Sequence, residues 1–139
     1  MTVNFEIIDF YALFYDGEQL DIHNNFDFIG YEYKFSGREL ILKWIKSDSD
    51  WVSDYEFSKL TLIHSNVSFL NISYDNNEYE FPGDDTCLSE VTFFPSALRI
   101  TNNEFIDQRK PNENDDIIYS FQSGHFIRVC CESVYLKTN

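Results

Sequence analysis

The side chains with the widest chemical range in this 139-residue chain are three histidines and three cysteines: His23, His64, His125, Cys87, Cys130 and Cys131. No two histidines stand at the short spacing typical of a metal site, so a metal centre would need distant parts of the chain to meet. His64 alternates with Leu60 and Leu62, which predicts a half-buried histidine on a strand. We therefore expect no bound metal.

A nucleophilic pair is a second kind of chemistry, built from one cysteine (Cys130 or Cys131) and one histidine (His125 or His64). A reactive thiolate needs a cationic neighbour or a helix N-terminus that lowers its pKa. The two cysteines instead continue the apolar stretch 126–129, where a free cysteine usually packs as a small hydrophobe. Adjacent strand residues point to opposite faces, so no bridge between these two is expected.

Carboxylates are a third possibility. Oxygen-bearing side chains stand at alternate positions from Asp48 to Asp54, as at the start of a calcium-binding loop, but the sixth position is not glycine and Lys59 stands at the twelfth. The pairs Asp84-Asp85 and Asp115-Asp116 lie beside turn-forming residues, which predicts solvated turns. The sequence contains no glycine-rich phosphate loop and no nucleophile elbow. We expect neither a cofactor nor an enzyme activity.

With 24 acidic side chains against 10 basic ones, the chain has a formal net charge of -14 at pH 7. The acids are clustered, because residues 1–33, 47–58 and 75–90 contain no Lys or Arg. Such a protein repels nucleic-acid backbones and anionic lipid, so neither is an expected partner. The carboxylates either keep the protein soluble or form a docking surface for a basic protein.

The candidate partner-binding residues combine clustered acids with one aromatic anchor, and they are Asp48, Asp50, Trp51, Asp54, Asp84 and Asp85. Aromatic side chains are frequent hot spots of protein interfaces. The sequence therefore predicts a non-catalytic acidic domain that docks on a basic protein.

A β-hairpin is predicted between residues 29 and 44, where apolar and polar side chains alternate on both sides of Ser36-Gly37. In this register Lys34 faces Glu39, and opposite charges favour cross-strand pairing. The apolar face of the hairpin would hold Ile29, Tyr31, Tyr33, Leu40, Leu42 and Trp44.

A second hairpin is predicted around Ser123-Gly124, with Phe121 opposite Phe126 if the turn has two residues. Its returning strand could continue through residues 134–136. Further strands are predicted at residues 59–64, 67–74, 78–81 and 88–94, and a long exposed loop at 102–116. Residues 5–14 fit either a short helix or a strand.

These elements predict a single mainly β domain over residues 1–139, an antiparallel sandwich or an incomplete barrel with little helix. The alternating aromatic residues, such as Phe26, Phe28 and Trp44, are most simply core. A sheet curled around an apolar ligand would have the same periodicity. A small apolar-ligand carrier is therefore the alternative function.

The N-terminal residues carry no early Lys or Arg and include Glu6 and Asp9 in their apolar stretch, which is unlike a secretory signal. No uncharged apolar run approaches the roughly 18–20 residues that cross a bilayer. An odd number of cysteines without a signal favours free thiols in the cytoplasm.

Three segments, residues 37–44, 59–67 and 121–129, have the layout of small acidic β-rich bacterial proteins, some of which are immunity partners of toxins. The resemblance covers residues 26–136 and rests on pattern and charge, so no functional residue is transferred. It implies a cytoplasmic protein that covers or distorts the active site of a toxin, often a basic nuclease, without catalysis of its own.

Overall fold

The computed structural model describes residues 1–74, 84–99 and 106–139. In these ranges the strands are β1 (Thr2–Val3), β2 (Glu6–Ile8), β3 (Ala12–Tyr15), β4 (Glu18–Asp21), β5 (Phe26–Lys34), β6 (Glu39–Lys46), β7 (Lys59–Ser65), β8 (Phe69–Tyr74), β9 (Leu88–Pro95), β10 (Asp115–Phe121), β11 (His125–Cys130) and β12 (Ser133–Thr138). The helices are α1 (Ile22–Asn25) and the 3₁₀ turn η1 (Ser96–Leu98). The strand predicted at 78–81 and residues 102–105 of the predicted loop lie outside the described residues.

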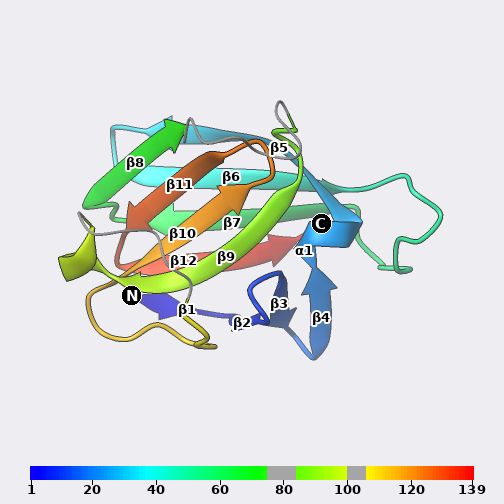
Figure 1. Cartoon of the computed structure of the whole chain (residues 1–139), viewed down its shortest axis with the longest axis horizontal. Coiled ribbons are helices and arrows are strands. Elements are labelled where there is room, and N and C mark those ends of the chain that lie inside the picture. The colour runs from blue at the N-terminus through cyan, green and yellow to red at the C-terminus, as the bar shows by residue number, and fades with distance from the viewer. Residues whose placement is uncertain (75–83, 100–105) are drawn as a thin grey trace.

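Two larger sheets lie one over the other, and a small sheet lies beside them (Figure 1). Their strand orders are β1-β12-β7-β6-β5 and β8-β11-β10-β9, with β2-β3-β4 as the small sheet. Every pairing among the described strands is antiparallel except that of β1 with β12. These sheets do not close into a barrel, so the predicted mainly β, antiparallel, sandwich-like class is confirmed. No helix in the described part of the chain is long and apolar enough to span a membrane.

Alternation along the strands fills the space between the two large sheets. Each sheet turns every second side chain inward, and the inward residues are almost all apolar. They include Leu40, Leu42, Trp44, Leu60, Leu62, Val91, Phe93, Ile117, Tyr119, Val129, Val134 and Leu136. Complete burial of one such side chain contributes about 1.5–3 kcal/mol. A one-residue slip of any strand would expose its whole set, so the pattern fixes the register.

The first predicted hairpin forms with the predicted pairing, and Lys34 lies opposite Glu39 with Nζ 3.3 Å from Oε1. Gly37 has a φ of +89° at the turn. The apolar face differs from the prediction because the pairing shifts between Phe28 and Gly30. At this bulge Phe28, instead of Ile29, lies against the buried Trp44 ring, with centroids 5.0 Å apart, and Ile29 is about half exposed. Tyr31 keeps its predicted pairing with Leu42 and is nevertheless about half exposed.

The second hairpin forms with a different turn from the two-residue one considered above. Ser120 pairs with Phe126, so the turn has three residues and Phe121 does not face Phe126. Gly124 has a φ of +93°, and its N–H donates to the Phe121 carbonyl at 3.0 Å. A three-residue turn that ends on a left-handed glycine is a common hairpin connection. Ser-Gly by itself did not distinguish the two lengths.

Two ambiguous segments are now assigned. Residues 5–14 contain β2 and the start of β3, which pair as a short hairpin, so no helix forms there. After β11 the chain does not continue as one strand but crosses to the other large sheet, where β12 pairs with β7. The adjacent Cys130 and Cys131 lie at this crossing, and all three cysteines are free thiols.

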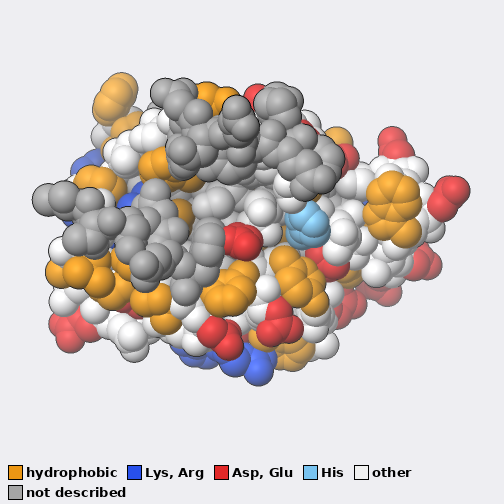
Figure 2. Space-filling model, in the orientation of Figure 1, with side chains coloured by type: hydrophobic (Ala, Val, Ile, Leu, Met, Phe, Trp, Pro, Cys, Tyr) orange, Lys and Arg blue, Asp and Glu red, His pale blue; other side chains and the backbone are white. Residues whose placement is uncertain are grey.

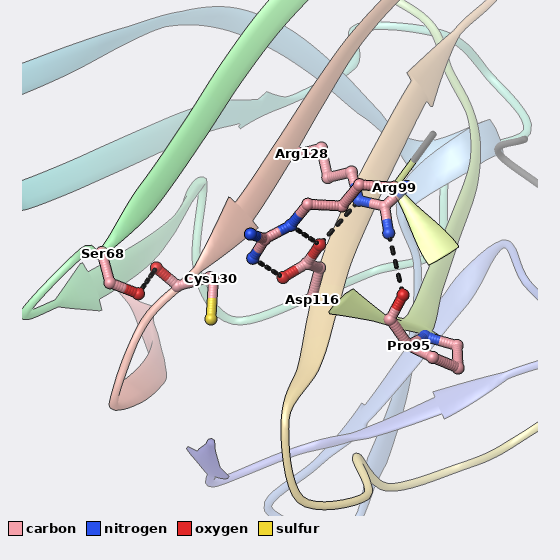
Figure 3. A network of polar contacts seen from close by, with 6 residues as sticks. All are labelled: Ser68, Pro95, Arg99, Asp116, Arg128 and Cys130. Carbon is pink, nitrogen blue, oxygen red and sulfur yellow. Dashed lines mark hydrogen bonds and ion pairs between the residues drawn. The ribbon is translucent and has the colours of Figure 1, made fainter. Parts of the chain in front are cut away.

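A second buried cluster lies on the other face of the four-stranded sheet (Figure 3). Asp116 on β10 and Arg128 on β11 alternate with core residues, so they point away from the hydrophobic core. Their side chains are nevertheless only 0% and 2% exposed. Asp116 accepts one hydrogen bond from Arg128 Nε at 2.7 Å and two from Arg99, at 2.8 and 2.7 Å. We call Arg99, Asp116 and Arg128 the ionic core.

The prediction of a solvated turn at Asp115-Asp116 is therefore wrong. Both residues belong to β10 and are 3% and 0% exposed. The Asp115 carboxylate also has hydrogen-bond partners, because its Oδ2 accepts from Gln108 Nε2 at 2.6 Å and from the Asn112 N–H at 2.7 Å. Buried carboxylates persist where donors of this kind compensate their lost hydration.

Candidate functional site

The loop between β6 and β7 carries four of the six candidate residues, and aromatic packing holds it against the body of the protein. The Phe26 ring packs against Tyr55 and Phe57, with centroids 5.3 and 6.1 Å apart. Tyr55 also accepts a hydrogen bond from Asn25 Nδ2 at 3.0 Å and donates to the Gln19 carbonyl at 3.3 Å. The loop is thus anchored on β4, α1 and β5, and its tip projects into solvent (Figure 1).

Trp51 stands on this projecting part of the loop. Its side chain is 72% exposed, yet its Nε1–H donates to the Asn24 carbonyl at 3.1 Å. An exposed indole with one fixed hydrogen bond loses little conformational freedom when a partner covers it. Asn24 lies in α1, whose N-cap is Asp21: the Asp21 side chain accepts from the Asn24 N–H at 2.9 Å.

We call the surface around this loop the acidic end, and it consists of Asp16, Glu18, Asp21, Asp48, Asp50, Asp54 and Glu56. Asp16, Glu18 and Glu56 line one hollow of about 170 Å³, which shows that the β3–β4 turn and the loop adjoin. Among the described residues, none of the seven carboxylates forms an ion pair. Figure 2 shows acidic side chains at this end, on the right of the viewed face, and others near its centre and along its lower edge; the visible basic ones lie at the left and bottom.

The other two candidates, Asp84 and Asp85, lie on a different segment, just before β9. Trp51 contacts α1 through Asn24, whereas Cys87, three residues after Asp84, contacts α1 through His23. Asp84 is occupied locally, because its Oδ1 accepts from the N–H groups of Thr86 and Cys87. The site predicted from the sequence therefore consists of one continuous loop and a second, separate acidic turn.

Asp85, His125 and Ser123 lie together, but not as a catalytic relay. His125 Nδ1 is 2.8 Å from Asp85 Oδ1 and 3.2 Å from Ser123 Oγ, so both oxygens meet the same ring nitrogen. A relay needs the nucleophile on one nitrogen and the carboxylate on the other. Ser123 is also fully buried. Hydrogen bonding to Ser123 is the main cause that lowers the pKa of Asp85; burial opposes it, and the charge and hydrogen bond of His125 add smaller lowering effects.

His64 is more deeply buried than predicted. Its side chain is 0% exposed, Nδ1 lies 3.1 Å from the Leu40 carbonyl and Nε2 lies 2.8 Å from the Tyr119 hydroxyl. Burial lowers the pKa of His64 from 6.5 to about 4. The ring is therefore neutral at pH 7 and joins the two sheets as a hydrogen-bonded core residue.

The thiols of Cys87 and Cys131 are held in the protonated form. Burial raises the pKa of Cys87 to about 11, and the charge of Asp84 adds to the effect. Burial likewise raises the pKa of Cys131 to about 12. Because the thiolate is the nucleophile, these two groups have the opposite of the shift that catalysis needs. Among the described residues, no three His, Cys, Asp or Glu side chains are placed to hold a metal ion.

An apolar hollow between the two large sheets bears on the carrier hypothesis. It has a volume of about 160 Å³ and is lined by Phe28, Tyr31, Ile72, Phe121 and Ile127, with Asp85 and His125 also at its wall. Sites for drug-sized ligands span about 300–1,000 Å³. The carrier remains a prediction, and mass spectrometry of the native protein for a retained ligand would test it.

Sequence reasoning missed the residues that hold the loop. Tyr55 and Phe57 stand between two charged stretches, and their spacing of two residues beside Trp51 was the available signal. Their partners in α1 and β4 are about 30 residues earlier in the chain, so only the folded structure brings them together.

The fold and this surface define an acidic, sandwich-like β domain with a projecting, aromatic-anchored loop. A scan against protein-family models and searches of curated proteins and of solved structures found no match to the chain.

Proposed function

We propose that the protein is a non-catalytic binding domain that docks on a basic protein partner through its acidic end. The observation that carries the proposal is Trp51, a 72% exposed indole that is fixed by a hydrogen bond. It lies among carboxylates that form no ion pair with any residue the structure describes. An aromatic anchor supplies contact area, and the surrounding charge accelerates encounter with a cationic surface.

A toxin is the partner class that the sequence resemblance implies, and the protein would then be its immunity partner in the cytoplasm. The acidic end suits that role because nucleases present basic surfaces to nucleic acid. Covering such a surface blocks the substrate without any chemistry by the inhibitor. The test is to identify the product of the neighbouring gene. If it is a basic toxin domain, we expect co-expression of this protein to restore growth of cells that produce the toxin.

A matched pair of variants tests the docking surface. Asp50→Lys/Asp54→Lys reverses two charges of the acidic end, and Asp107→Lys/Glu113→Lys reverses two exposed acids outside it. The tagged proteins are used to isolate a stoichiometric partner from the native cell at low salt. We expect the first variant, but not the second, to slow association at least about tenfold, with the difference shrinking as salt is added.

Trp51→Ala completes the test, and it should speed dissociation more than it slows association because the indole acts after encounter. Recovery of no stoichiometric basic partner at any ionic strength would contradict the proposal. Equal loss of binding in the two charge-reversed variants would show a dependence on net charge alone, and it would equally contradict docking at the acidic end.

A further inference from the structure

A polar pocket of about 330 Å³ lies beside α1. Four segments meet there: the β2–β3 turn with Asp9, α1 with His23 and Asn24, the start of β9 with Ser89 and Glu90, and the β10–β11 turn with Gln122. Its volume is at the lower end of the range for ligand sites, about 300–1,000 Å³. It therefore suits one side chain or another small group.

A β-bulge gives the pocket its wall. Ser120 pairs with Glu90, but the next residue, Phe121, pairs with Leu88, so Ser89 is the extra residue on β9. In a regular strand Ser89 and Glu90 would point to opposite faces, whereas here both line the pocket. Bulges re-aim side chains in this way and are frequent beside functional sites.

The β2–β3 turn is tied to the pocket from both sides. The Phe10 carbonyl accepts from the Val91 N–H of β9 at 2.7 Å, and the Tyr11 carbonyl accepts from the His23 N–H of α1 at 3.4 Å. Asp9 has a φ of +50°, a left-handed conformation that Asp and Asn tolerate better than most residues. The backbone of the turn that carries Asp9 is thus positioned by contacts with both neighbouring elements.

The pocket is acidic, because its two carboxylates, Asp9 and Glu90, form no ion pair with a Lys or Arg among the described residues. In the described part of the chain, Asp9 and Glu90 have neither an ion pair nor a side-chain hydrogen bond, and no Lys or Arg lines the pocket. Burial raises the pKa of Glu90, against a smaller effect of His23. The ring of His23 is itself oriented, since Nδ1 lies 2.8 Å from the Leu88 carbonyl. A half-buried carboxylate without a donor favours an incoming cation.

We propose that this pocket binds a guanidinium group, namely an arginine side chain of the partner. This inference rests on the proposed function, because the docked partner supplies the arginine. A guanidinium has five N–H donors in a plane, so it can use several acceptors at once. The residues that line the pocket include the two carboxylates of Asp9 and Glu90 and the side-chain amides of Asn24 and Gln122, whose oxygens are further potential acceptors. An ammonium is a point charge with three donors and uses this arrangement less fully.

The pocket adjoins the acidic end through Asn24. The side of α1 that lines the pocket includes Asn24, and the carbonyl of the same residue accepts the Trp51 hydrogen bond. One partner surface can therefore cover Trp51 and insert an arginine next to it. Aromatic and arginine contacts are the two most enriched kinds of interface hot spot.

The first experiment uses N-acetyl-argininamide as the probe, with N-acetyl-lysinamide for comparison. Binding is followed by NMR through the side-chain amides of Asn24 and Gln122 and the ring of His23. We expect saturable shifts at these groups, with the lysine probe at least several-fold weaker. Asp9→Asn/Glu90→Gln keeps the side-chain shapes and the left-handed turn, and it should weaken the arginine probe at least about tenfold.

Asp107→Asn/Glu113→Gln removes the same charge elsewhere, and it should leave the dissociation constant of the arginine probe unchanged. Circular dichroism and thermal melting establish that each variant is folded. Shifts spread over the acidic surface, equal affinity for the two probes, or equal weakening in both variants would overturn the inference.

The isolated partner then distinguishes this inference from the proposed function. Partner binding that is lost in Asp50→Lys/Asp54→Lys but unchanged in Asp9→Asn/Glu90→Gln refutes the arginine contact and leaves the docking function standing. Saturable arginine binding that depends on Asp9 and Glu90, in a protein that captures no basic partner, refutes the docking function and points to a free guanidinium ligand. Loss of partner binding in Asp50→Lys/Asp54→Lys and in Asp9→Asn/Glu90→Gln supports the docking function and the arginine contact together.

Discussion

The ionic core and the acidic end use the same functional group in opposite ways. Asp116 is fully buried and has two guanidinium partners, whereas the carboxylates of the acidic end are hydrated and have no ion pair in the described structure. Removing a charge from water costs several kcal/mol, so a buried carboxylate must be compensated. An exposed carboxylate keeps its water and remains available to a partner. The comparison teaches that burial decides whether a carboxylate is paired within the fold or stays exposed to solvent.

The largest effect is expected for Asp116→Asn. This change removes the carboxylate that Arg128 and Arg99 contact, while Arg128 stays 2% exposed. Breaking a buried ion pair from one side typically costs about 3–5 kcal/mol. Urea unfolding followed by circular dichroism measures the loss.

Arg99→Met provides a second measurement if Asp116→Asn does not fold. The Arg99 side chain is 30% exposed, so its removal should cost less than the loss of Asp116. A ranking in the other order, or a free energy of unfolding unchanged in both variants, would contradict the role of the ionic core in stability.

The second effect concerns a buried group without a countercharge. Above pH 6.5 His64 is neutral in both states, but as the pH falls from 6.5 to about 4 the unfolded chain gains a proton that the folded protein does not. Stability contributed by the neutral ring is lost over this window, by up to about 3 kcal/mol. Denaturant unfolding at several pH values, in the wild type and in His64→Gln, isolates the contribution.

His64→Gln should be less stable than the wild type at pH 7, because it loses the fit of the ring between the sheets. The difference in unfolding free energy between the two proteins should narrow toward pH 4. Parallel stability curves between pH 4 and 7 would show that His64 does not titrate as its burial implies.

The third prediction is a small change in stability when charges of the acidic end are reversed. Asp48→Lys/Asp50→Lys/Asp54→Lys replaces exposed side chains without ion pairs, so the free energy of unfolding should change by no more than about 0.5 kcal/mol. Any change should be a gain at low salt, since like charges are separated. The urea midpoint at two ionic strengths checks this, and a loss above 2 kcal/mol would place these acids among structural residues.

The smallest effect is expected for Trp51→Phe. Trp44 is fully buried and Trp51 is 72% exposed, so acrylamide should quench chiefly the red-shifted emission of Trp51. The substitution should remove this quenchable component and change stability by less than about 0.5 kcal/mol. Persistence of the quenchable emission in Trp51→Phe would assign it to Trp44 and contradict the exposure of the loop.

Local patterns predicted much of the fold. The alternation around Ser36-Gly37 gave the correct pairing of Lys34 with Glu39, because a two-residue period and a glycine turn act within a few residues. The bulge at Ile29 escaped prediction, and with it the packing of Phe28 rather than Ile29 against Trp44. A bulge depends on the curvature of the whole sheet, and a short window of sequence carries no information about that curvature.

At the ionic core, by contrast, the local sequence gave a wrong prediction. Asp115 and Asp116 follow asparagine and glutamate, and in isolation that composition indicates a solvated turn. Arg128 among apolar residues was the available signal for a buried cation that needs a carboxylate. Its partner was not predictable, because Asp116 becomes adjacent only when β10 pairs with β11 and η1 brings in Arg99.

The candidate residues were grouped from the clustering of charge in the sequence. The structure places Asp48, Asp50, Trp51 and Asp54 on one exposed loop, and Asp84 and Asp85 on another segment, just before β9. Partner binding at these residues stays a prediction. The pocket of Asp9 and Glu90 gave no signal, since its walls come from four segments and from a bulge.

The sequence alone determined the sheet class, the register of the first hairpin and the excess of negative charge, because each follows from residue type and short-range periodicity. The tertiary structure alone decided which carboxylates are buried and paired and which remain hydrated. Burial depends on what packs above a residue, and here the covering residues come from strands and turns far away in the chain.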